Sequence, residues 1–180
     1  MGSKPDPFYR MGIEIPARLN TPLDPRKFYA FVSEKAVGLI DVYPFSAVEL
    51  CPGINIHPMN FLVEAAGKNL SSYTAVELVP ETVKFLEGRK ASNRIHVVKR
   101  GMANEVDAIR LGRKKCDLLV LSGLQDENIK KIIGRLFGKV KFFLIYSQDT
   151  GRFSTLLPGY ALTFFSFPGD APCALFAVLK

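Results

Sequence analysis

The chain has 180 residues, 48% of them apolar, and a formal net charge of +7. This composition suits one folded domain and excludes a disordered, collagenous or coiled-coil chain. The longest apolar run, residues 140–146, is far below the ~18 residues that cross a bilayer, and the first twenty residues lack the apolar segment of a secretory signal. We therefore expect a soluble cytoplasmic protein that does not bind membranes.

The N-terminal residues 1–24 are rich in proline and are predicted to form an arm, followed by a single domain over residues 25–180. Asp24 can accept hydrogen bonds from the free amides at a helix start, and Pro25 suits the first helical position. Apolar residues then recur at helical spacing and predict a helix that lies against a sheet: Phe28, Phe31, Val32 and Leu39. The arm is a candidate lid over a ligand site or a candidate contact in a homodimer.

From Ser46 onward, short apolar runs alternate with amphipathic stretches. The strand-like runs are 47–51, 73–78, 94–98, 117–122, 140–146, 160–167 and 173–179. The helix-like stretches are 58–67, 80–89, 103–111 and 126–137. Such alternation predicts parallel strands joined by right-handed crossovers.

The last two strand-like runs depart from this alternation, because only residues 168–172 separate them. A parallel crossover needs about a dozen residues or more, so the final strand is predicted to run antiparallel to its neighbour. The predicted fold is therefore α/β: a seven-stranded, mostly parallel sheet with helices on both faces and a reversed final strand.

Ligands of an open parallel sheet bind beyond the carboxyl ends of its strands. The first of these ends carries Glu49, followed by a turn at Gly53, where a ligand can approach the backbone closely. The second carries Glu77, whose carboxylate can accept both hydroxyl hydrogens of a ribose. The alternative is that both acids are solvent-facing strand ends and that Gly53 only forms a turn.

The sequence V-E-L-C-P-G-I-N around this turn resembles the first motif of the class I S-adenosylmethionine-dependent methyltransferases, an acidic residue at a strand end followed by G-x-G-x-G. On that pattern Glu49 takes the acidic position and Gly53 the central glycine, while Cys51 and Asn55 stand in place of the outer glycines. The resemblance implies S-adenosylmethionine as the cofactor. It places Glu49 near the methionine amino group and the loop around Gly53 beside the methionine portion.

The resemblance covers about residues 25–180 and includes the reversed final strand. It gives Glu77 the role of holding the ribose, and it places Asn104 near the adenine amino group unless Asn104 caps the next helix. Ser122 lies where the family positions its methyl acceptor. The implied cofactor-binding residues are Glu49, Cys51, Gly53, Asn55, Glu77, Leu78, Met102, Ala103, Asn104 and Ser122. No catalytic residue and no acceptor are predicted, and Asp126 is expected to cap a helix.

The positive charge is concentrated in residues 84–115, which hold ten basic and three acidic residues. Such a segment can face a polyanion such as nucleic acid, or it can be a solvated helix surface. Two of the three loop glycines are missing, which supports an alternative function. This is a catalytically inactive methyltransferase-fold protein that binds nucleic acid or an acidic partner. A nicotinamide-dependent oxidoreductase ranks last, because the loop matches one of the three glycines in G-x-G-x-x-G.

The cysteines and histidines do not form the spacing of a metal site. Cys51, Cys116 and Cys173 are far apart, and neither His57 nor His96 has a ligand-type neighbour at helical or strand spacing. We expect three buried free thiols, two packed or solvent-facing imidazoles, and no bound metal.

Overall fold

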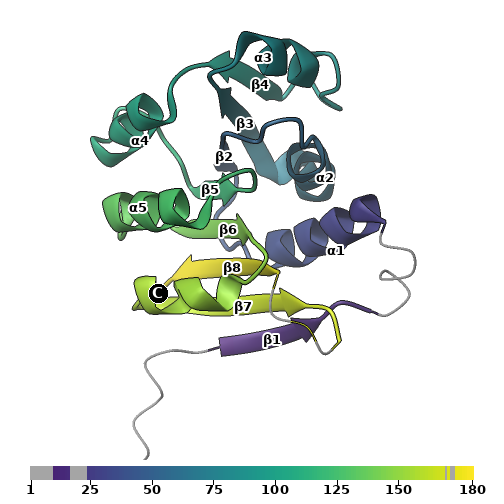
Figure 1. Cartoon of the computed structure of the whole chain (residues 1–180), viewed down its shortest axis with the longest axis vertical. Coiled ribbons are helices and arrows are strands. Elements are labelled where there is room, and N and C mark those ends of the chain that lie inside the picture. Colours follow the sequence, from purple (N-terminus) through teal and green to yellow (C-terminus); the bar gives the residue numbers. More distant parts are fainter. Residues whose placement is uncertain (1–9, 17–23, 169, 171–172) are drawn as a thin grey trace, which may run out of the picture.

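The computed structural model describes residues 10–16, 24–168, 170 and 173–180. Most of the predicted arm, residues 1–9 and 17–23, lies outside the described residues. Helices and strands alternate around one sheet (Figure 1). In chain order the elements are β1 (Arg10–Glu14), α1 (Pro25–Gly38), β2 (Phe45–Leu50), α2 (His57–Ala66), η2 (Gly67–Asn69), β3 (Leu70–Glu77), α3 (Pro80–Glu87), β4 (Ile95–Lys99), α4 (Met102–Arg110), β5 (Leu118–Leu121), α5 (Asp126–Leu136), β6 (Phe142–Tyr146), η3 (Thr150–Leu156), β7 (Tyr160–Ser166) and β8 (Ala174–Leu179).

The sheet has eight strands in the order β1-β7-β8-β6-β5-β2-β3-β4. Its strands pair in parallel except around β8, which lies between β6 and β7 and is antiparallel to both. The predicted reversed final strand is thus confirmed. The chain order turns back at β2, which has β3 on one side and β5 on the other. Such a switch point is where open α/β sheets bind ligands.

The predicted strand number of seven was one too low, because the structure adds β1 to the seven expected strands. β1 forms inside the predicted arm and pairs in parallel with β7 along its whole length. Ile15, just after β1, is fully buried, and its amide donates a 2.7 Å hydrogen bond to the Ser166 carbonyl. The alternation of Met11, Ile13 and Ile15 is a strand pattern. It was missed because the surrounding prolines dominated the interpretation.

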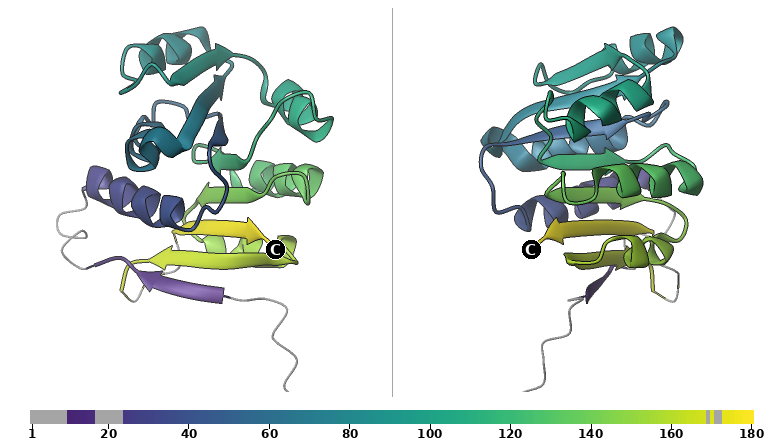
Figure 2. Two further views of the ribbon diagram at one scale, coloured as in Figure 1. Left: turned by 180° about the vertical axis from the view of Figure 1, so that it is seen from behind. Right: turned by 90° about the vertical axis from the view of Figure 1, so that its left-hand side faces the viewer.

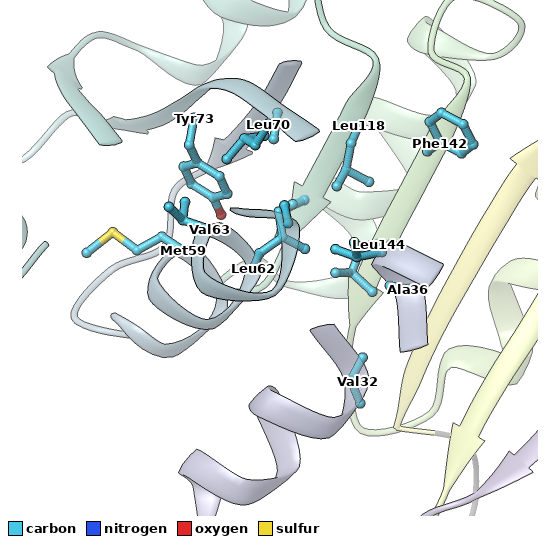
Figure 3. Close-up of a cluster of buried hydrophobic side chains, with 14 of the residues drawn as sticks. Val32, Ala36, Met59, Leu62, Val63, Leu70, Tyr73, Leu118, Phe142 and Leu144 are labelled. Carbon is cyan, nitrogen blue, oxygen red and sulfur yellow. The ribbon is translucent and has the colours of Figure 1, made fainter. Parts of the chain in front are cut away.

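The first helix begins as the sequence predicts. The Asp24 carboxylate accepts a 3.0 Å hydrogen bond from the Arg26 amide, and Pro25 occupies the first helical position. The buried face of α1 includes Val32 and Ala36, which belong to the same core cluster as residues of α2, β3, β5 and β6 (Figure 3).

Two apolar cores lie on opposite faces of the sheet. The first lies beneath α1, α2 and α3 and includes Met59, Leu62 and Leu86. The second lies beneath α4, α5 and η3 and includes Val106 and Ile133. Figure 2 shows the helices as layers on both faces of the twisted sheet. Because both faces are covered, β2, β5 and β6 are buried along their whole lengths.

Candidate functional site

The carboxyl ends of β2, β3, β5 and β6 bring four loops together at the switch point. The loops after β2 and β5 are in direct backbone contact: a β-carbon added to Gly123 would overlap the Cys51 carbonyl oxygen. Glycine is therefore required at 123 for the two loops to approach. This contact places Ser122 beside the loop that contains Gly53.

Glu49 is completely buried near the end of β2. Its carboxylate accepts a 2.8 Å hydrogen bond from the Tyr73 hydroxyl and a 2.5 Å hydrogen bond from the Ser122 hydroxyl. Burial raises the pKa of Glu49 to about 7, although the two hydrogen bonds oppose this rise. The carboxyl group is therefore held in a defined position and changes its protonation state near neutral pH.

Glu77 faces the turn after β2, and the two are in contact. One carboxylate oxygen accepts a 3.2 Å hydrogen bond from the Gly53 amide. The other accepts hydrogen bonds from the Leu78 amide at 2.7 Å and the Val79 amide at 3.3 Å. A carboxylate has about four lone-pair positions, so these three amides leave room for one further donor.

The turn after β2 has a glycine-like backbone even where the glycine is replaced. Cys51 has φ = 51° and Gly53 has φ = 59°, both in the left-handed region. Burial and the charge of Glu77 raise the pKa of the Cys51 thiol to about 11, so the thiol is protonated at neutral pH. Cys51 thus retains the backbone shape of a glycine loop without offering a reactive thiolate.

Asn55 connects this turn to helix α1. Its side-chain amide donates a 2.9 Å hydrogen bond to the Tyr29 hydroxyl, and its oxygen accepts from the His57 amide. The Tyr29 ring also stacks on His57 at 5.6 Å between centroids. Tyr29 was not among the predicted site residues, because its position on α1 is 26 residues away in sequence.

Apolar side chains are exposed on both sides of the Glu77–Gly53 contact. Ile54 is 74% exposed, Leu78 58% and Val79 48%. Exposed aliphatic side chains gathered around a buried carboxylate are typical of a surface that a ligand covers.

Met102, Ala103 and Asn104 lie in the first turn of α4, just after β4. Met102 and Ala103 line a cavity of about 340 Å³ between α4 and α5, together with Ile132. Asn104 is exposed within the helix, whose N-terminal cap is Gly101, so the alternative role of Asn104 as the cap is wrong. Within the described residues, the Glu77 side chain accepts hydrogen bonds from Gly53, Leu78 and Val79, and from none of these three residues.

An aromatic cavity of about 380 Å³ lies on the other side of Ser122. Phe28 and Tyr29 of α1 line it, together with Tyr146 at the end of β6 and Phe167 just after β7. The Tyr29 and Tyr146 rings are 4.9 Å apart, and the Phe28 and Phe167 rings 5.6 Å. Sites for small molecules have volumes of about 300–1,000 Å³ and predominantly apolar walls, and this cavity has both properties.

Asp126 is the first residue of α5 and not its N-terminal cap, which is Gln125; the predicted capping role is therefore wrong. Its carboxylate instead accepts hydrogen bonds from the Ser147 hydroxyl at 2.8 Å and from Arg152 at 2.5 Å. Ser147 lines the aromatic cavity with Ser122, and both also line a neighbouring hollow of about 460 Å³.

Several cations of the basic segment 84–115 have partners within the protein. Arg100 and Lys114 both form ion pairs with the fully buried Glu105. Arg94 donates to backbone carbonyls, including that of Leu70. Part of the charge excess therefore has a structural role, which the sequence did not reveal because Glu105 had no distinguishing pattern.

The cysteines agree with the prediction in part. All three are free. Cys116 is buried, whereas Cys51 and Cys173 are half-buried, so the expectation of three buried thiols was wrong for two of them. Cys51 lies in the strand-end loop, and Cys173 lines the aromatic cavity.

The strand order, the reversed β8 between β6 and β7, and the helices on both faces define a class I methyltransferase fold. In the part of the chain that the structure describes, no helix has the length and apolar character needed to cross a membrane. No protein-family model matches the chain, and no curated protein matches its sequence.

Solved structures show the similarity that sequence searches do not. The N-terminal domain of human METTL16 in complex with SAH is 15% identical with a TM-score of 0.60, and the match covers 88% of this chain and 72% of that one. The human methyltransferase 10 domain containing protein is 17% identical with a TM-score of 0.59, covering 86% and 82%. M. capricolum TrmK with S-adenosyl-homocysteine is 12% identical with a TM-score of 0.54, covering 82% and 66%. The chain likewise spans 66% of one METTL16 methyltransferase domain.

Proposed function

We propose that this protein is a methyltransferase that uses S-adenosylmethionine. The observation that carries the proposal is the contact between Glu77 and Gly53, which joins the ends of β3 and β2 at the switch point. When bound, S-adenosylmethionine supplies a methyl group on a positively charged sulfur, which an acceptor takes by in-line displacement. Alignment and exclusion of water carry much of the acceleration of such a reaction.

The residues around this contact fit the cofactor. Glu77 accepts ribose hydroxyl hydrogens, while the exposed Ile54 and Leu78 cover apolar parts of the nucleoside. Because the carboxylate has room for only one further donor, a ribose that donates twice takes the place of the Gly53 amide. We infer a small outward shift of the turn at Gly53 on binding. Cys51 and Asn55 belong to the same turn, and Met102, Ala103 and Asn104 are proposed to contact the adenine.

Calorimetric titration with S-adenosylhomocysteine tests the proposal. We expect saturable binding to the native protein and at least tenfold weaker binding to Glu77→Gln, because one of the two accepting oxygens becomes an NH2 group that can only donate. The matched control is Glu81→Gln, an exposed acid in the first turn of α3, which is expected to bind as the native protein does. Absence of binding heat at high micromolar ligand, with circular dichroism showing a folded protein, would contradict the proposal.

A second candidate is a binding protein for nucleic acid that no longer uses a cofactor. It is favoured by the β-carbon at Cys51 within a loop of glycine-like backbone and by the exposed cations Lys99, Arg113 and Lys115. Binding of RNA through phosphates would weaken steeply with salt and would be unchanged in Glu77→Gln. Gel-shift assays over a range of salt concentrations distinguish this candidate from the first.

A further inference from the structure

Ser122 lines the aromatic cavity, and its hydroxyl hydrogen is engaged by a buried carboxylate. Ser122 donates a hydrogen bond to the buried carboxylate of Glu49 at 2.5 Å. A serine hydroxyl whose only hydrogen points at a carboxylate has just its lone pairs left for other partners. Towards the cavity, Ser122 is therefore a hydrogen-bond acceptor.

Glu49 is well placed to hold this arrangement. It is completely buried, and its other oxygen accepts from the Tyr73 hydroxyl, so both carboxylate oxygens have a donor. The cavity beside Ser122 has aromatic walls from α1 and β6, namely Phe28, Tyr29 and Tyr146. A planar group with one hydrogen-bond donor matches the aromatic walls and the Ser122 acceptor.

We propose that this cavity binds the methyl acceptor, a neutral aromatic compound whose O–H or N–H donates to Ser122, and that Ser122 passes a proton to Glu49 during methyl transfer. The inference rests on the proposed function. It adds the chemical class of the acceptor and the destination of its proton.

The proton and electron movements balance. With S-adenosylmethionine bound, the acceptor oxygen or nitrogen would form a bond to its methyl carbon, and the carbon–sulfur bond would break with its electron pair left on sulfur. The acceptor proton moves to the Ser122 oxygen while the original Ser122 proton moves to Glu49. One positive and one negative charge are neutralised, and no other reactant is needed.

Protonation of Glu49 should therefore change which ligands the cavity prefers. The titratable groups that face Glu49 are the hydroxyls of Tyr73 on β3, Tyr29 on α1 and Tyr146 on β6. Burial raises the pKa of each tyrosine above its ordinary value of 10, so all three remain neutral near pH 7. When Glu49 is ionised, Ser122 offers lone pairs to the cavity. When Glu49 is protonated, it can donate to Ser122, whose own proton then turns towards the cavity.

Phenol and anisole test the inference, because they share one aromatic ring and only phenol can donate a hydrogen bond. Both are titrated into the full chain saturated with S-adenosylhomocysteine, and binding is followed by NMR shifts of Tyr29 and Tyr146. We expect phenol to bind at least fivefold tighter than anisole at pH 8, with the ratio falling towards one at pH 5.5. Ser122→Ala should bring the ratio to about one at both pH values.

One variant serves as a control, and another is a second test. Ser147→Ala removes another hydroxyl of the same cavity, one that donates to Asp126, and should retain the phenol preference. Glu49→Gln changes the proposed proton acceptor itself and should remove the pH dependence of the phenol-to-anisole ratio. Equal binding of phenol and anisole to the native protein, or an unchanged ratio in folded Ser122→Ala, would overturn the inference.

The test also separates the inference from the function on which it rests. Binding of S-adenosylhomocysteine without phenol discrimination overturns only the acceptor assignment. Phenol discrimination without any S-adenosylhomocysteine binding, measured on protein alone, overturns the methyl-transfer step.

Discussion

The backbone of Cys51 has a left-handed conformation, which costs a residue with a β-carbon about 1–2 kcal/mol. Glycine adopts it without this cost. Position 51 therefore keeps the backbone conformation of a glycine loop, although a cysteine stands there in place of the glycine. The sequence showed the missing glycine, whereas only the structure shows that the conformation persists.

Two substitutions at Cys51 measure this strain. We expect Cys51→Gly to be more stable than Cys51→Ala by about 1 kcal/mol, the reverse of their order at an ordinary position. Both variants lose the sulfur, so their difference isolates the backbone contribution. Urea unfolding measures it, and a more stable alanine variant would show that the turn carries no strain.

The buried Glu49 should make the stability of the protein depend on pH. The pKa of Glu49 is about 7 in the folded protein and 4.5 when the protein is unfolded. Between these two pH values the folded state therefore binds more protons than the unfolded state. The free energy of unfolding therefore falls as pH rises from about 4.5 to 7, by on the order of 3 kcal/mol in total. Glu49→Gln should lose this contribution. Urea unfolding at pH 5 and pH 8 checks it, and an equal pH dependence in both proteins would contradict the burial of an ionisable group.

Among the site residues, the sequence identified those that follow strands and missed those that come from elsewhere. Glu77 and Gly53 were predicted to face each other across a nucleoside-wide cavity, because the carboxyl ends of neighbouring parallel strands share one edge of the sheet. The structure instead joins them directly, with the Gly53 amide donating to the Glu77 carboxylate. Tyr29 and Tyr73 were missed because an aromatic residue in an amphipathic pattern is indistinguishable from a core residue. Their hydroxyl partners, Asn55 and Glu49, are far away in sequence.

At the level of elements, β1 is attached to the sheet through one neighbour only. It pairs with β7, and the fully buried Ile15 follows it. Truncating a buried isoleucine side chain to alanine lowers the free energy of unfolding by about 2–5 kcal/mol. We expect Ile15→Ala to lower the free energy of unfolding by about 3 kcal/mol and to increase the hydrogen exchange of β7 amides.

The matched control for this prediction is Ile13→Ala, because Ile13, two residues earlier on β1, is only partly buried. Its effect should be clearly smaller. If Ile15→Ala leaves β7 exchange unchanged, β1 does not protect the edge of the sheet.

Periodicity predicted the elements best where one face is buried over a long stretch. The four helices expected between the strands agree with α2, α3, α4 and α5 to within two residues at each end, because turn residues such as Pro80 and Gly88 delimit them. β1 has only five residues, and the prolines on both sides of it pointed to an arm, so its short pattern was missed. The reversal of β8 followed from a chain-length argument and needed no side-chain detail.

At the scale of the whole molecule, one sheet separates two cores, and Cys116 belongs to the core beneath α4 and α5. Cys116 is 8% exposed, and burial raises the pKa of its thiol well above the ordinary value. We expect a thiol reagent to modify Cys116 only when the protein unfolds globally, with the same urea dependence as circular dichroism. The half-buried Cys173 is the internal comparison and should react first. Equal rates at the two thiols without urea would show that this core opens locally.

The placement of β8 between β6 and β7 has a consequence for synthesis. β7 and β1 connect to the rest of the sheet only through β8, which follows both of them in the chain. While the ribosome is still making the protein, the strands up to β6 can already assemble, but the open side of β6 has no neighbour. Completion of the sheet must therefore wait until Ala174–Leu179 has been translated, and until then the open side of β6 is exposed to pairing with another molecule.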